Sequence, residues 1–134
     1  MKYLLDTNTC IAYLNGSNTN VLHHMQRLKP VDIALCSVVK SELWYGATKS
    51  QVATQTLTKL FVFFNQFASL PFDDRAARES ARIRTDLAKK GTPIGPYDVQ
   101  IAGIARLHTL KVVTNNVSEF GRVIGLQLEN WYES

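Results

Sequence analysis

Apolar and polar positions along the chain follow two spacings, one typical of short buried strands and one typical of helices. Short, largely apolar runs at residues 2–5, 32–36 and 110–114 have the length of buried strands, and the last of them is rich in β-branched residues. Between these runs, apolar residues recur three or four positions apart, which predicts helices over residues 7–14, 18–28, 51–67, 73–90 and 97–108, with another beginning after residue 36. Such alternation predicts an α/β fold, a three-layer α/β/α domain with a mainly parallel central sheet.

Capping and turn residues predict where the helices begin and end. Asn15-Gly16 closes the first helix, and either Ser17 or Asn18 can cap the second. Ser37 is expected to cap the third helix, and Gly95 before a proline to set up the helix over residues 97–108. The remaining expected elements are an extended segment over residues 69–72, a short helix over 116–120 and a last strand over 126–128.

Composition limits the class of protein. A chain of 134 residues with 46% hydrophobic and 19% charged residues can bury a core as one domain, so we expect a single domain over residues 1–134. An acid within the first apolar run argues against a signal peptide, and no apolar run approaches the roughly 20 residues of a membrane span. Cys10 and Cys36 form no metal-binding motif, so reduced, buried thiols and a cytoplasmic location are expected.

The net charge of +4 favours polyanionic partners only weakly. Basic residues concentrate in the predicted helix over residues 73–90, where a solvated helix face explains them somewhat better than an RNA-binding track. Trp44 and the aromatic residues between 60 and 67 are interpreted as core or interface rather than as a base-stacking platform.

Four acidic residues map to one edge of the predicted sheet. Parallel strands direct their carboxyl ends, and the turns that follow them, to the side where ligands bind in open α/β sheets. The four acids are Asp6, Glu42, Asp98 and Glu119. Carboxylates brought together repel one another unless a cation neutralises them, and Mg²⁺ or Mn²⁺ prefers such oxygen ligands.

Each acid alone also has a structural explanation. Asp6 can cap the helix that begins at residue 7, and Glu42 can pair with a nearby lysine on an exposed helix face. Asp98 in a first helical turn is favoured by the helix dipole. Glu119 lies three residues after Asn116, which is the spacing of a capping box. A shared function is therefore argued from their convergence.

Four sequence blocks give this convergence a specific meaning. They are LLDTN at residues 4–8, SELWYGA at 41–47, GPYDVQIA at 95–102 and VTNNVSEF at 113–120. In this order the blocks resemble the signature motifs of VapC-type toxin ribonucleases of the PIN-domain family, and the resemblance covers essentially the whole chain. It implies Asp6 and Asp98 as the principal metal ligands, with Glu42 and Glu119 completing the catalytic pocket directly or through water.

The resemblance further implies a Mg²⁺ cofactor, with Mn²⁺ as an alternative, a VapB-type antitoxin partner, a homodimer and an RNA substrate such as tRNA. Many PIN domains have aspartate where this chain has Asn116. The fourth site position therefore stays open between Asn116 and Glu119. Glu119 resembles the substitute acid of one VapC subgroup, and the alternatives are that it supports the site from outside or only caps a helix. The side chains expected to orient carboxylates and waters are Thr7, Asn8, Thr114 and Asn116.

The implied reaction is hydrolysis of RNA by a metal-activated water, which leaves 5′-phosphate and 3′-hydroxyl ends. One alternative is a phosphatase of the haloacid-dehalogenase class, which requires a second aspartate two residues after the first. Residue 8 is asparagine here, which argues against that class. The other alternative is a non-catalytic RNA- or protein-binding module with the same fold.

Overall fold

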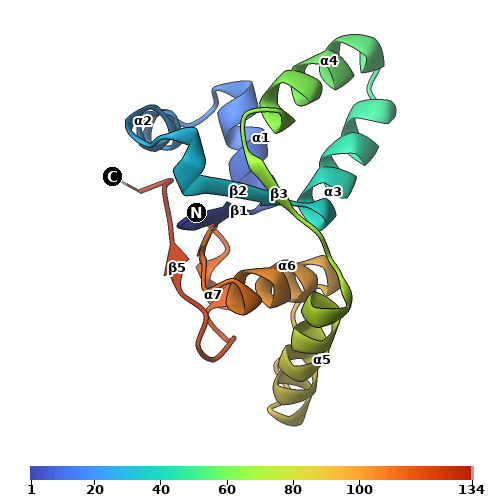
Figure 1. Ribbon diagram of the computed structural model, residues 1–134, viewed down its shortest axis with the longest axis vertical. Coiled ribbons are helices and arrows are strands. Elements are labelled where there is room, and N and C mark those ends of the chain that lie inside the picture. Colours follow the sequence, from blue (N-terminus) through green and yellow to red (C-terminus); the bar gives the residue numbers. More distant parts are fainter. Residues whose placement is uncertain (134) are drawn as a thin grey trace.

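The computed structural model describes residues 1–133. Its strands are β1 (Tyr3–Leu5), β2 (Ile33–Cys36), β3 (Ala68–Leu70), β4 (Lys111–Val113) and β5 (Leu128–Glu129). The helices are α1 (Thr7–Asn15), α2 (Thr19–Arg27), α3 (Ser37–Thr48), α4 (Ala53–Phe64), α5 (Asp74–Lys89), α6 (Pro96–Leu107) and α7 (Val117–Phe120), and a 3-10 turn spans Pro30–Asp32. Helices α1 to α4 lie on one side of the sheet and α5 to α7 on the other (Figure 1).

The sheet has five strands in the order β3-β2-β1-β4-β5, and every neighbouring pair is parallel. The predicted α/β class is confirmed, and the sheet is wholly rather than mainly parallel. β1 occupies the centre, where Leu4 lies opposite Ala34 of β2 and Val112 of β4. Leu4 and Leu5 are completely buried, as expected for a strand covered by helices on both faces.

Two of the predicted caps are present at the helix ends and a third is not. Gly16 closes α1 in the left-handed conformation with φ 63°, and Asn18 rather than Ser17 caps α2 by accepting from the backbone N–H of Val21 at 3.0 Å. The prediction that Ser37 caps α3 was wrong, because Ser37 is already the first helical residue and Cys36 of β2 precedes it without a side-chain cap. Strand β2 therefore passes into α3 with no linking residue.

Two predicted boundaries moved because of pairing between strands. The extended segment after α4 joins the sheet as β3, an edge strand beside β2. The last strand forms over Leu128–Glu129 instead of residues 126–128, because β4 selects the register: Val112 N–H donates to the Gln127 carbonyl at 2.9 Å, and Thr114 N–H donates to the Glu129 carbonyl at 3.0 Å. The local sequence pattern does not determine which residues of this segment pair with β4.

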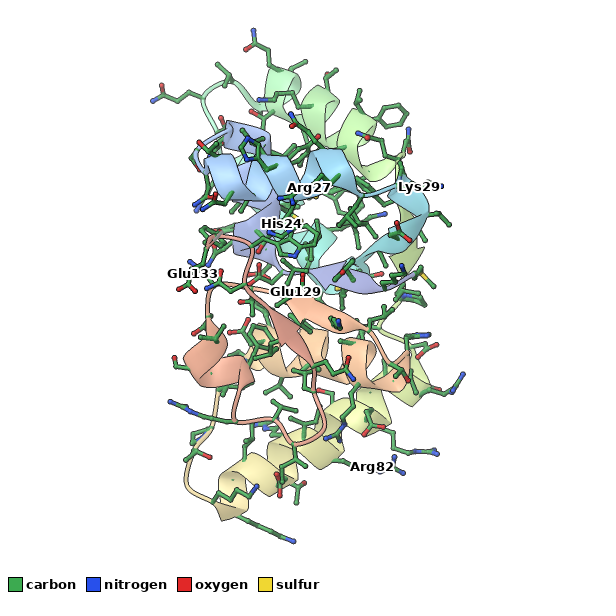
Figure 2. All side chains as sticks on the ribbon, turned by 90° about the vertical axis from the view of Figure 1, so that its left-hand side faces the viewer. His24, Arg27, Lys29, Arg82, Glu129 and Glu133 are labelled. Atoms are coloured by element: carbon green, nitrogen blue, oxygen red, sulfur yellow. The ribbon has the colours of Figure 1, made fainter. Side chains whose placement is uncertain are left out.

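The segment after β5 packs between α2 and the sheet. Trp131 is completely buried, with its ring stacked on His24 at 5.1 Å between centroids and 5.3 Å from the ring of Tyr3. Its indole N–H donates to Glu129 Oε1 at 3.0 Å. Figure 2 shows His24 on α2 facing Glu129 of β5 on this side of the molecule. The C-terminal segment is thus part of the core.

Helices α5 and α6 pack at very short range on the other side of the sheet. A Cβ added to Gly103 of α6 would lie 3.0 Å from the backbone of Ser80 on α5. Arg106 of α6 forms an ion pair with Glu79 of α5 and also donates to the Ile124 carbonyl at 2.9 Å. These contacts fix α6, whose first turn carries Asp98.

Two composition-based expectations can be compared with the structure. No helix within residues 1–133 is long and apolar enough to cross a membrane. Cys10 and Cys36 are free and buried, as expected, and burial raises the pKa of the Cys36 thiol to about 11 and that of Cys10 well above its ordinary value. Neither thiol is activated as a nucleophile.

Candidate active site

Asp6 lies directly after β1 and is almost completely buried, at 5% exposure. Its Oδ1 accepts from the backbone N–H of Thr9 at 2.9 Å, so the capping role considered for this residue is real. Burial raises the pKa of Asp6, and the nearby Glu42 carboxylate raises it further, whereas hydrogen bonds from Thr114 and Thr9 lower it. A carboxylate offers about four acceptor positions, so capping leaves Asp6 able to bind a cation as well.

Glu42 is in the second turn of α3 and is held by Thr7 of α1. The Thr7 hydroxyl donates to Glu42 Oε1 at 2.6 Å. Within residues 1–133 Glu42 makes no ion pair, so the proposed pairing with Lys40 or Lys49 does not form. The contact instead joins the first turn of α1 to α3 and directs Glu42 toward the end of β1.

Asp98 lies in the first turn of α6, close to Gly95, where an added Cβ would be 3.6 Å from Asp98 Oδ2. Its pKa is raised to about 6, first by burial and then by the negative charges of Glu119, Asp6 and Glu42. The helix dipole explains an acid at this position but not the proximity of three more. Asp98 therefore lies in the field of all the other predicted site acids.

Glu119 is held by Asn116 in an arrangement that differs from a capping box. The Asn116 side-chain N–H donates to Glu119 Oε2 at 2.6 Å, and Asn116 makes no side-chain cap on α7. Its backbone N–H donates to Thr114 Oγ1 at 2.9 Å. Asn116 and Glu119 thus form a hydrogen-bonded pair after β4.

Thr9 is a supporting residue that the sequence-based analysis missed. It is completely buried, and its hydroxyl donates to the Val113 carbonyl of β4 at 3.1 Å, which ties α1 to the strand beside β1. Asn8, expected to orient carboxylates, is exposed, and its backbone carbonyl accepts from the Tyr132 hydroxyl at 2.9 Å. The only sequence signal for Thr9 is its position three residues after the capping aspartate.

The carboxyl edge of the sheet thus brings Asp6, Glu42, Asp98 and Glu119 into electrostatic contact. Among residues 1–133 no three acidic, histidine or cysteine side chains converge on one point as a complete ligand set. The available donors are carboxylate oxygens held by hydroxyl and amide groups, which is the chemistry that Mg²⁺ and Mn²⁺ accept while retaining several waters. The donor types suit a hard divalent cation, and water would have to supply the coordination positions that the described side chains leave open.

A hollow of about 400 Å³ lies beside these acids. We name it the tyrosine hollow, and its walls include Thr7, Glu42, Tyr45, Gly46, Lys49 and Tyr97. A second, more apolar hollow of about 320 Å³ runs from Glu42 along α1, α3 and α4, past Ile11, Leu14, Leu43 and Leu60.

Comparison with known proteins agrees with this geometry. The family model for the PIN domain matches residues 3–125. The tRNA(fMet)-specific endonuclease VapC of Salmonella typhimurium is 39% identical over 98% of both chains, and ribonuclease VapC2 of Rickettsia felis is 36% identical over 98% of both. The toxin fold in the crystal structure of DNA-bound VapBC from Salmonella typhimurium superposes with a TM-score of 0.92 at 39% identity, covering 98% of each chain.

The chain belongs to the PIN domain family, and its full-length relatives place it among the VapC ribonucleases. The family suggested by the four sequence blocks is confirmed. The phosphatase alternative fails on the same comparison.

Proposed function

We propose that this chain is the toxin of a type II toxin and antitoxin pair and acts in the cytoplasm as a Mg²⁺-dependent endoribonuclease on structured RNA. The observation that carries the proposal is the meeting of Asp6, Glu42, Asp98 and Glu119 at one sheet edge in a chain of this family. Transfer RNA is the expected substrate class, and initiator tRNA is the first to assay, because a full-length relative is named for tRNA(fMet).

In this proposal, Asp6 and Asp98 bind the metal directly, and Glu42 and Glu119 bind it directly or through water. Bound Mg²⁺ supplies water activation and charge neutralisation at the scissile phosphate. Thr7 holds Glu42 and Asn116 holds Glu119 by the 2.6 Å hydrogen bonds, which orients both carboxylates before substrate arrives. Thr9 fixes Asp6 from the backbone, so its carboxylate cannot rotate away from the site.

Cleavage should require Mg²⁺ or Mn²⁺ and stop in EDTA, because without a cation the clustered acids repel both one another and the RNA phosphate. The measurement is cleavage of tRNA by protein freed of metal, with and without added Mg²⁺, followed by analysis of the ends. We expect 5′-phosphate and 3′-hydroxyl ends and no hydrolysis of a generic phosphomonoester. Full activity of metal-free protein in EDTA, or 2′,3′-cyclic phosphate ends, would contradict the mechanism.

A small antitoxin is the proposed protein partner, and a homodimer is the proposed assembly of the chain. The apolar hollow along α1, α3 and α4 ends at Glu42, so an apolar segment seated there can place a basic side chain against the acids. Solved relatives include VapBC complexes, which supports a partner of this kind.

Light scattering should give the mass of a dimer, and the product of the neighbouring gene should co-purify and suppress cleavage. A monomer with no such partner would be the contrary result.

A further inference from the structure

The tyrosine hollow opens directly beside the acids but contains chemistry that cation binding does not require. It shares Thr7 and Glu42 with the acid cluster, and Tyr97 immediately precedes Asp98 in the first turn of α6. Anything bound in this hollow is therefore adjacent to the proposed point of cleavage.

Two aromatic rings wall the hollow and remain largely in solvent. Tyr97 is 56% exposed and Tyr45 is 67% exposed. A single exposed aromatic residue needs no explanation, but two on the same small hollow present a π surface that a flat ligand can cover. Neither ring contributes much to the core, so the fold does not account for their identity.

Lys49 adds a positive charge to the same wall. Its Nζ lies 4.7 Å from the centre of the Tyr45 ring, a cation–π contact that orients both side chains along α3. Within residues 1–133 Lys49 makes no ion pair with a carboxylate, although Glu42 is two turns away on the same helix. The charge is thus available to a phosphate.

Gly46 lines both the tyrosine hollow and the apolar hollow. It lies inside α3, where alanine would favour the helix more than glycine does, and a Cβ added there would meet no atom within 4 Å. Packing and backbone conformation therefore give no reason for glycine at this position. A bound ligand that approaches the backbone of α3 closely would explain why glycine is present at this position.

We propose that the tyrosine hollow binds a nucleotide of the RNA next to the scissile phosphate, with its base stacked on Tyr97 against the Tyr45 wall and its phosphate contacting Lys49. The proposal deepens the proposed ribonuclease function and rests on it. Stacking plus a nearby cation is how proteins hold unpaired nucleotides. A peptide of the antitoxin is the competing occupant. It is less favoured because Ile11 is the one large aliphatic side chain that lines the tyrosine hollow, whereas the apolar hollow adds Leu14, Leu43 and Leu60 to Ile11.

The test replaces each tyrosine with leucine, which retains bulk but removes the aromatic face, and with phenylalanine, which retains the face. Tyr97→Leu and Tyr45→Leu should each lower kcat/KM for RNA cleavage by roughly tenfold, mostly through KM, whereas the phenylalanine variants should cleave like wild type. Phe61→Leu is the matched control, because Phe61 is also 67% exposed but lies on α4 outside the hollow. It should have no effect.

Two further measurements separate stacking from a structural role. RNA carrying 2-aminopurine beside the cleavage site, bound to the Asp98→Asn protein so that it stays uncut, should lose fluorescence when tyrosine or phenylalanine is present and keep it with leucine. Gly46→Ala should weaken cleavage while Tm stays equal or rises, because the added methyl group hinders a ligand that approaches the helix closely and alanine strengthens the helix.

The outcomes are distinguishable. If wild-type protein cleaves RNA and both leucine variants match it in kcat/KM, the nucleotide site is wrong while the ribonuclease function stands. If the leucine variants retain RNA kinetics but bind antitoxin more weakly, the hollow is a peptide site and the proposal is overturned. If wild-type protein neither binds nor cleaves RNA with Mg²⁺, the proposed function fails and this site fails with it.

Discussion

Asp98→Asn should lower RNA cleavage by several orders of magnitude while leaving the fold intact. Asparagine keeps the shape of the side chain but removes a charged ligand, so the activation of water and the alignment of phosphate are both lost. The measurement is single-turnover cleavage of tRNA at saturating Mg²⁺. Near-normal turnover of this variant would show that the acid cluster has been assigned the wrong role.

Wild-type protein should respond to pH in a defined direction when metal is absent, and Asp98→Asn should lack the part of this response that comes from Asp98. The pKa of Asp98 in the folded chain is about 6, above its ordinary value of 3.8, so the folded state binds the proton more tightly than the unfolded state does. The contribution of Asp98 to the stability of the metal-free protein should therefore rise as pH falls from about 7 to 4, and it should be absent in Asp98→Asn. Thermal melting in EDTA across this range measures the difference between the two proteins.

Asp6 requires a pair of substitutions because it has two roles. Asp6→Asn keeps an oxygen that can accept from Thr9 N–H, so Tm in EDTA should change little. Cleavage should fall by orders of magnitude, because the variant lacks the negative charge of the proposed metal ligand. Asp6→Ala should lose cleavage equally and also about 1 kcal/mol of stability, through the lost cap. Unfolding of Asp6→Asn would instead show that capping is the main role of this residue.

Trp131→Ala should be the most destabilising of these substitutions, by about 3–5 kcal/mol. The side chain is completely buried between His24 and Tyr3, so truncation leaves a cavity and also removes the partner of Glu129 Oε1. Urea denaturation of the metal-free protein gives the free energy of unfolding. Trp44→Ala is the control, because Trp44 is 46% exposed and contacts Phe64 only edge-on, so its loss should cost much less. Equal effects would mean that the C-terminal segment is not part of the core.

Helices whose apolar faces and end residues are local in the sequence were predicted correctly. Boundaries that depend on pairing between distant strands were missed. Periodicity and caps located α1, α2, α5 and α6 to within a few residues, because their apolar faces and end residues are local properties. The register of β5 depends on hydrogen bonds to β4, and the cap expected at Ser37 failed because β2 runs directly into α3. Neither outcome can be read from the residues nearby.

The predicted site residues show the same division. Asp6 after β1 and Glu119 after β4 were identified because parallel strands send those ends to one edge, and in the structure Asp98 lies in the field of Asp6, Glu42 and Glu119. Which neighbours hold them depends on contacts across the chain: Thr7 reaches Glu42, and Thr9, not Asn8, is the buried threonine bonded to β4. The residues in each of these contacts, Thr7 with Glu42 and Thr9 with Val113 of β4, are far apart in the sequence and meet only in the folded chain.

The central position of β1 delays assembly of the site until late in synthesis. The first strand pairs on one side with β4, so Tyr3 meets Lys111 only after most of the chain has been made. At about 5–20 residues per second, that interval is roughly 5 to 20 seconds, during which Asp6 exists without Asp98 or Glu119 beside it. For most of translation, the chain on the ribosome therefore lacks the complete set of acids on which the proposed cleavage depends.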